Sequence, residues 1–141
     1  MKALNITLKY FTLFLIGGIS YYFIEIAYRG YSHFSMVIVG GLCFILIGSI
    51  NEFSNKEIPL LLQMLISVLI VDIVELVSGI IINRVLLLNV WDYSRLRFNF
   101  LGQISLNSSI TWFFLSLLAI YIDDLLRYLI YKEEKPGYKF I

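Results

Sequence analysis

Residues 58–84 read IPLLLQMLISVLIVDIVELVSGIIINR and form the main part of the longest apolar run in this chain of 141 residues. A helix needs roughly 20 apolar residues to cross about 30 Å of hydrocarbon, and this run is longer. At about 1.5 Å per residue a helix of this length must tilt, extend beyond the bilayer or break. We expect the chain to leave the hydrocarbon at Asn83 and Arg84, and residues 85–90 to lie along the outer surface.

Three further apolar runs accompany it, at about residues 4–27, 34–50 and 104–131. Backbone groups cannot remain unpaired in lipid, so each run is predicted to be a transmembrane helix. The sequence therefore predicts an all-α fold. It is a single domain over residues 1–141, a polytopic integral membrane bundle of four transmembrane helices with a polar C-terminal tail at 132–141.

The composition supports lipid as the solvent. Hydrophobic residues make up 60% of the chain and charged residues 15%, whereas soluble domains are about 45–50% apolar and about 25% charged. A soluble domain this small could not bury so much apolar surface. The net charge of +1 gives no electrostatic basis for binding nucleic acid. We expect the lipid bilayer as a partner and no nucleic acid.

Lysine and arginine near helix ends predict the orientation. With four crossings, both termini share one side with the connection after the second run. The basic residues on that side are Lys2, Lys9, Lys56, Arg127, Lys132, Lys135 and Lys139. Those on the other side are Arg29, Arg84, Arg95 and Arg97. The bias predicts a multi-pass protein of the cell membrane with cytoplasmic N- and C-termini.

Three carboxylates are candidates for a functional group within the apolar runs: Glu25, Asp72 and Glu75. Two others, Asp123 and Asp124, lie with Arg127 at the inner end of the last run, where we expect them to anchor the helix at the interface. An ionisable group in a transmembrane helix is costly, and such groups often mark ion or proton pathways. The spacing of three places Asp72 and Glu75 on neighbouring positions of one helix face. Glu75 is therefore a candidate proton or cation site.

A structural interpretation of the carboxylates stands beside the functional one. Glu25 can reach Arg29 four residues later on the same helix. Glu75 can hydrogen-bond to Tyr21, Tyr22 or Asn107 on other helices. Bonds of this kind hold membrane helices together, at about 1 kcal/mol each or less. The sequence leaves both interpretations open.

The segment from Trp91 to Asn99 forms part of the longest predicted loop, at residues 92–103. It combines an interfacial aromatic residue with turn-forming Asp and Ser residues. It is either a capping and anchoring turn or the wall of a vestibule. The residues that we predict to line a polar cavity are Glu25, Arg29, Asp72, Glu75, Trp91, Asp92, Tyr93 and Asn99.

Glycines recur within the apolar runs, as pairs at residues 17–18 and 40–41 and singly at Gly48 and Gly79. Small residues allow helix backbones to approach closely in lipid. The pattern predicts tight helix packing without any ligand.

Motifs for enzymatic chemistry are missing from the sequence. It has no G-x-x-x-x-G-K-[ST], no H-E-x-x-H and no G-x-S-x-G. With one cysteine, Cys43, and one histidine, His33, the chain cannot build a Cys- or His-based metal site of its own. We predict that it is not an enzyme and carries no metal or other cofactor.

The stretches NVWDYS at 89–94 and FNFLGQISL at 98–106 resemble the CmpB-like family of small membrane proteins, the type IV permeases of ABC transporters. That family has a W-D-Y-S motif followed by N-x-x-G and another helix. It also has a Glu before Arg-Gly late in the first helix, matched by Glu25, Arg29 and Gly30, and a Glu in the helix before the W-D-Y-S loop, matched by Glu75. The resemblance covers nearly the whole chain.

Three shorter segments, SHFSM at 32–36, GGLC at 40–43 and DDLLRY at 123–128, are similar to a short Gram-positive subgroup of that family. One departure is that many members carry prolines after the first helix, and residues 35–41 contain none. The resemblance implies a permease that depends on a separate ATPase subunit.

The sequence thus favours a small integral membrane protein that acts as a transport-permease-like subunit, with its substrate unassigned. The alternatives are a non-transporting membrane adaptor or structural protein, and a small self-assembling pore of the holin type. We expect a homo-oligomer, because four short helices leave little room for a pathway within one chain.

Overall fold

The computed structural model describes residues 2–52, 57–134 and 137–141. Its four α-helices coincide with the four apolar runs, which confirms the predicted all-α class. They are α1 (Lys2–Arg29), α2 (Ser35–Glu52), α3 (Leu60–Gly79) and α4 (Leu106–Tyr131). A π-helical turn, η1 (Ile80–Val85), continues α3, and two short strands, β1 (Asn99–Phe100) and β2 (Ile104–Ser105), precede α4.

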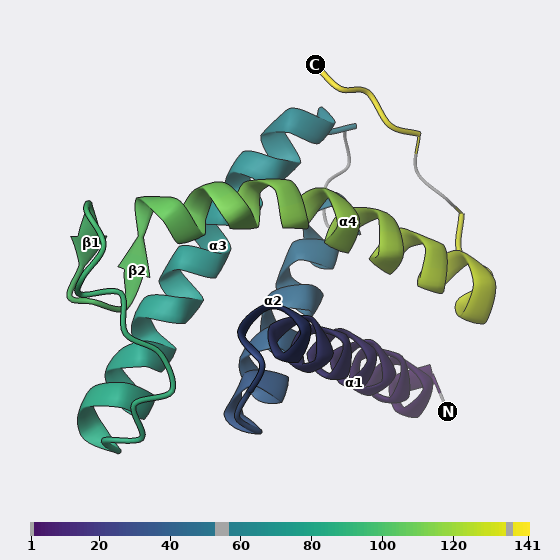
Figure 1. The fold of residues 1–141 in the computed structure, drawn as a ribbon. Coiled ribbons are helices and arrows are strands. Elements are labelled where there is room, and N and C mark those ends of the chain that lie inside the picture. Colours follow the sequence, from purple (N-terminus) through teal and green to yellow (C-terminus); the bar gives the residue numbers. More distant parts are fainter. Residues whose placement is uncertain (1, 53–56, 135–136) are drawn as a thin grey trace.

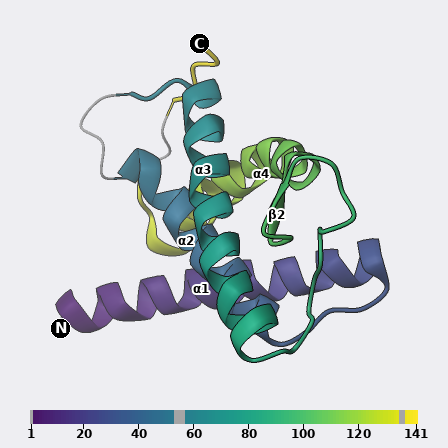
Figure 2. The same ribbon diagram turned by 90° about the vertical axis from the view of Figure 1, so that its left-hand side faces the viewer.

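Helix α2 lies at the centre and contacts each of the other three helices. The helices cross steeply: in Figure 2, α1 runs across the direction of α3. Figure 1 shows α4 crossing α3 in the same manner. The helices therefore do not form a bundle of nearly parallel helices. Most of the packing between them runs through α2.

Helix α3 carries its apolar side chains outward. Its exposed stripe comprises Leu62, Leu65, Leu69, Ile73, Val77 and, in η1, Ile81. Its buried residues are Gln63, Met64, Ser67, Val71, Glu75 and Gly79, of which four are polar or glycine. A helix in water shows the opposite pattern, so lipid is the medium that fits the outer face.

Within the part of the chain that the structure describes, three segments are long and apolar enough to cross a membrane: Leu4–Arg29, Ser35–Glu52 and Leu60–Val85. Helix α4 is not among them. It has polar residues near both ends, including Asn107 and Ser108 at the start and Asp123, Asp124 and Arg127 in the second half.

Helices α1 and α2 are held together through glycines, as the sequence predicted. A Cβ atom on Gly18 would collide with the backbone carbonyl oxygen of Val37. A Cβ atom on Gly41 would lie 2.6 Å from the carbonyl oxygen of Phe14. Since backbone cannot move aside as a side chain can, any larger residue at either position forces the helices apart.

The chain leaves α3 through η1, where the amide of Leu86 donates to the carbonyl oxygen of Ile81 at 2.9 Å. The helix thus ends in a widened π turn that includes Asn83 and Arg84.

The sequence analysis missed the β1–β2 hairpin, which begins within the predicted loop at 92–103 and ends just beyond it. Gly102 turns that hairpin with a φ of +69°, a conformation that favours glycine. Because β2 takes residues 104–105, α4 begins at Leu106 rather than at 104.

The start of α1, the end of α2 and the segment after α4 meet in a cluster of charges. Lys9 near the start of α1 forms an ion pair with Glu133 after α4 and lies 4.0 Å from Glu52 at the end of α2.

The C-terminal tail lies beside the start of α3, as Figures 1 and 2 both show. There the amides of Leu60 and Leu61 donate to the carbonyl oxygens of Lys139 and Phe140.

Candidate functional site

A cavity of about 330 Å³ lies between α1, α4 and the segment that follows α3. Its polar side chains come from all three elements. They are Glu25 and Arg29 from α1, Tyr93 from the loop, and Asn107, Ser108 and Thr111 from α4. Polar groups between long apolar helices are costly, so their concentration here identifies the candidate site.

Glu25 accepts three hydrogen bonds at the wall of this cavity. Its Oε2 atom accepts hydrogen bonds from Arg29 Nη2 at 2.9 Å and from Ser32 Oγ at 2.8 Å, and its Oε1 atom accepts one from Tyr21 Oη at 3.1 Å. The predicted pair of Glu25 and Arg29 is thus confirmed. Arg29 also donates from Nη1 to the carbonyl oxygen of Val90 at 3.2 Å, which ties α1 to the loop after α3.

Glu75 is buried behind the cavity wall, with a relative exposure of 2%. Its Oε1 atom accepts a hydrogen bond of 3.0 Å from Trp112 Nε1, and its Oε2 atom has no hydrogen-bond partner. The partner on another helix is therefore Trp112, and not Tyr21, Tyr22 or Asn107 as we predicted. Helix rotation decides which residue of α4 faces Glu75, and the sequence does not specify it.

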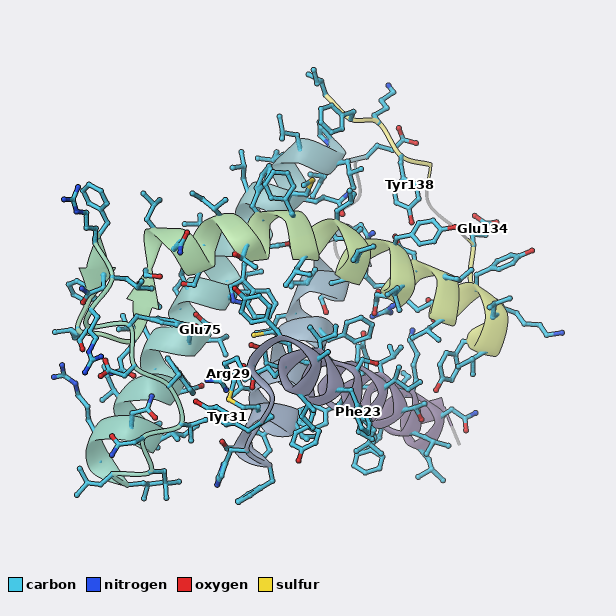
Figure 3. All side chains as sticks on the ribbon, in the orientation of Figure 1. Phe23, Arg29, Tyr31, Glu75, Glu134 and Tyr138 are labelled. Atoms are coloured by element: carbon cyan, nitrogen blue, oxygen red, sulfur yellow. The ribbon has the colours of Figure 1, made fainter. Side chains whose placement is uncertain are left out.

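Trp112 joins Glu75 to the cavity. Its ring lines the cavity and stacks on Tyr21 of α1, with ring centroids 5.2 Å apart. Figure 3 shows Glu75 and Arg29 at the same end of the molecule, with Tyr31 next to Arg29. The Arg29 guanidinium lies 4.9 Å from the centre of the Tyr31 ring.

Asp72 does not line the cavity. Both of its carboxylate oxygens accept hydrogen bonds of 2.9 Å from Ser109 Oγ on α4. The bond lies on the contact between α3 and α4, one helical turn from the bond between Glu75 and Trp112. Asp72 therefore connects two helices.

Within the W-D-Y-S segment, Tyr93 lines the cavity and its neighbours build the loop. Trp91 is buried, and its Nε1 atom donates to the carbonyl oxygen of Gln103 at 3.0 Å. Asp92 is exposed, and its Oδ1 atom accepts from the Ser94 amide at 2.9 Å. That backbone hydrogen bond lowers the pKa of the Asp92 carboxyl below its usual value.

Asn99 also belongs to the loop. Its Nδ2 atom donates to the carbonyl oxygen of Leu96 at 2.7 Å, and its Oδ1 atom accepts from the Gly102 amide at 3.0 Å. Of the eight predicted site residues, the structure gathers Glu25, Arg29 and Tyr93 around the cavity. Glu75 does not line the cavity and is joined to it through Trp112. Trp91, Asp92 and Asn99 support the loop, and Asp72 supports the contact of α3 with α4.

The sequence analysis missed Asn83 and Gln103, which hold the loop in place. Asn83 Oδ1 accepts from the Val90 amide at 2.7 Å, and Asn83 Nδ2 donates to Gln103 Oε1 at 2.8 Å. Gly79 allows this arrangement, because a Cβ atom there would collide with Gln103 Oε1. The position of Asn83, a polar residue at the end of the longest apolar run, could have indicated its role. No feature of the sequence indicated the role of Gln103.

A second polar cavity, of about 400 Å³, lies at the other end of the molecule. Its walls include Asn51, Glu52, Asp124, Arg127 and Glu133. Figure 3 places Glu134 and Tyr138 at this end, away from Glu75 and Arg29.

The buried ion pair of this end lies beside the second cavity. Arg127 Nε donates to Asp123 Oδ2 at 2.8 Å, and both side chains are almost fully buried. Nearby, the hydroxyl of Tyr138 donates to Asp124 Oδ2 at 2.7 Å, and burial raises the pKa of Tyr138.

Within residues 2–52, 57–134 and 137–141, no three His, Cys, Asp or Glu side chains are arranged to hold a metal ion. The groups that the first cavity offers are a carboxylate–guanidinium pair, hydroxyl and amide groups, and several aromatic rings.

Comparison with known proteins agrees with the membrane character of the helices. No curated protein and no solved structure matches the chain. The family described as "Putative ABC-transporter type IV" (ABC_trans_CmpB) matches residues 12–139. Since this match covers nearly the whole chain, the protein belongs to that family of ABC-transporter-type membrane proteins.

Proposed function

We propose that the protein is the membrane subunit of an ATP-driven transport system and that the cavity between α1, α4 and Tyr93 receives the solute. The observation that carries the proposal is the cavity itself. Polar side chains, among them Glu25, Arg29 and Asn107, share the wall of about 330 Å³ of space with aromatic and aliphatic side chains. Close helix packing would have excluded such space, and α1 and α2 show that this chain packs closely where glycines permit it.

The energy source must come from outside the chain, because the sequence contains no phosphate-binding loop. The proposal therefore assigns the chain no enzymatic activity and requires a separate ATPase subunit. We assign the contact with that subunit to the second polar cavity, at the end where Lys9, Glu52 and Arg127 meet. Charged groups are suited to a contact that faces water.

For the topology we propose four crossings with α4 as the fourth, and both termini in the cytoplasm. Two observations support it. The start of α1 and the end of α4 meet through Lys9 and Glu133, as an even number of crossings requires. The end that holds Lys9 and Arg127 also has more basic residues in the sequence than the other. A reporter fused after Ile141 should be active inside the cell, and activity outside would overturn this topology.

The test of the proposed function is an affinity purification from the native host in mild detergent, followed by mass spectrometry of the retained proteins. A stoichiometric ATPase subunit is the expected result. Purification of the chain by itself, as a homo-oligomer without an ATPase, would contradict the proposal.

A second function, that of a membrane adaptor, is favoured by one specific observation. Glu25, Asp72 and Glu75 each hydrogen-bond to a residue that stabilises the fold: Arg29, Ser109 and Trp112. An adaptor needs nothing further from these carboxylates. Reconstitution into liposomes together with the retained partners separates the two functions, since an adaptor gives no flux.

A further inference from the structure

We propose that the cavity binds a monovalent organic cation, an ammonium ion that carries a short apolar substituent. The inference names the solute class of the site and rests on the proposed function for its role in transport. The binding itself follows from the rings, the charges and the shape of the cavity.

Aromatic rings form much of the wall. Tyr21 and Tyr28 come from α1, Tyr93 from the loop and Trp112 from α4. Aromatic faces attract cations through the ring quadrupole, and groups of such rings recognise quaternary ammonium ions. Tyr21 and Trp112 already stack on each other across the two helices, so part of this ring cluster is ordered before any ligand enters.

The charges around the cavity favour a cation over an anion. Arg29 is compensated by Glu25 at 2.9 Å. Glu75 lies directly behind Trp112, and its Oε2 atom is buried without a hydrogen-bond partner. A buried carboxylate without a counter-charge is costly. When Glu75 is ionised, a positive solute in the cavity supplies the missing charge, whereas a negative solute adds a repulsion.

The hydrogen bond between Trp112 and Glu75 strengthens this preference. An indole N–H group that donates to a carboxylate shifts electron density into the ring. The face of Trp112 that lines the cavity therefore becomes more attractive to a cation. In this way Glu75 acts on the solute without touching it, as a positioning and polarising residue.

Apolar side chains beside the rings account for the substituent. A smaller cavity of about 120 Å³ lies next to the first, between α1, α2 and α4. Tyr21, Trp112, Ile24 and Leu115 line both cavities. The charged head of the solute would lie against the rings, with its apolar substituent against Ile24 and Leu115.

Isothermal titration of the purified protein in a non-ionic detergent tests the inference, with protein-free micelles as the blank. The probes are hexyltrimethylammonium, tetramethylammonium and hexanesulfonate. We expect binding of hexyltrimethylammonium, binding of tetramethylammonium that is weaker by about tenfold because it lacks the apolar chain, and no binding of hexanesulfonate. Absence of hexyltrimethylammonium binding, or equal binding of hexanesulfonate, would overturn the inference.

Variants locate the binding site. Glu75→Gln removes the charge and keeps the size, and it should weaken hexyltrimethylammonium binding by about fivefold or more. Glu57→Gln is the matched control, because Glu57 is exposed and lies at the other cavity. Equal affinities for these two variants would contradict the role of Glu75.

A second variant covers the case in which Glu75→Gln does not fold. Tyr93→Leu removes a ring from the loop, outside the helices, and should weaken binding by about threefold or more. Tyr128→Leu is its control, since Tyr128 is exposed on α4 and does not line the cavity. Unchanged binding by Tyr93→Leu would count against the aromatic site.

The titration needs neither an ATPase nor transport, so its result is independent of the proposed function. Binding by a chain that retains no ATPase would overturn the transport proposal and support the cation site. The reverse pattern, an ATPase without ammonium binding, would overturn the cation site and leave the transport proposal standing.

Discussion

Trp112 Nε1 lies 3.0 Å from Glu75 Oε1, and this hydrogen bond joins a buried carboxyl group on α3 to a ring of the cavity wall on α4. Each partner limits what the other can do. The carboxyl group fixes the orientation of the ring, and the ring excludes water from the carboxyl group. A substitution at Glu75 that keeps this hydrogen bond and removes the charge can therefore separate the structural role of the carboxyl group from its electrostatic role.

Glu75→Gln should retain the fold and lose solute flux. The glutamine carbonyl oxygen still accepts from the Trp112 indole, so the melting temperature in detergent should change little, while the charge is lost. Flux in liposomes, measured together with thermal unfolding, checks both parts. If Glu75→Gln instead unfolds the protein, the carboxyl group is structural and the adaptor function gains support.

Gly18→Ala should destabilise the protein. Its Cβ atom would collide with the Val37 carbonyl oxygen, so α1 and α2 must separate, at a cost of about 1–3 kcal/mol or more. Thermal unfolding in detergent measures the loss. Gly137→Ala is a suitable control, because its Cβ atom would have 3.8 Å of clearance to Glu57 Oε1. Equal stability of the two variants would mean that the helices are not in close contact at Gly18.

Asn83→Ala should loosen the loop that carries Tyr93. It leaves the buried amide of Val90 without its acceptor at 2.7 Å, at a cost of about 1–3 kcal/mol. Hydrogen exchange should become faster at Val90 and Trp91 and stay unchanged in α1. The exposed Asn5 on α1 provides the control through Asn5→Ala. Unchanged exchange at Val90 would show that Asn83 does not hold the loop.

Arg127→Leu should destabilise strongly, since it leaves Asp123 buried without its partner at 2.8 Å. Removing one member of a buried pair costs about 3–5 kcal/mol, whereas replacing both members by apolar residues is often nearly neutral. The double variant Asp123→Leu with Arg127→Leu should therefore recover most of the lost stability. A double variant as unstable as the single one would show that Arg127 acts mainly through its contacts with Glu52 and Glu133.

The helices could be predicted from the sequence because the solvent determines them. An apolar run in lipid must be helical to satisfy its backbone, and each run in this chain is a helix. Contacts within one helix could also be predicted. Glu25 reaches Arg29 as the spacing of four requires, and Arg127 reaches Asp123 in the same way.

Contacts between helices could not be predicted to the same degree. The partner of Glu75 depends on how α4 is rotated about its axis, and several residues of α4 could have faced it. The hairpin before α4 is held by a hydrogen bond from Asn83 Nδ2 to Gln103 Oε1, which joins residues 20 positions apart in the sequence. Its strands have two residues each, too few for an alternating pattern to be recognised.

The contact of the C-terminal tail with α3 has a consequence for biosynthesis. The first turn of α3 donates its free amides, at Leu60 and Leu61, to carbonyl oxygens of Lys139 and Phe140. The ribosome makes these acceptors only after it has made α3, the hairpin and α4. During translation α3 is therefore made before the acceptors for its first turn exist. Synthesis of residues 139–140 is then the event that caps the start of this helix.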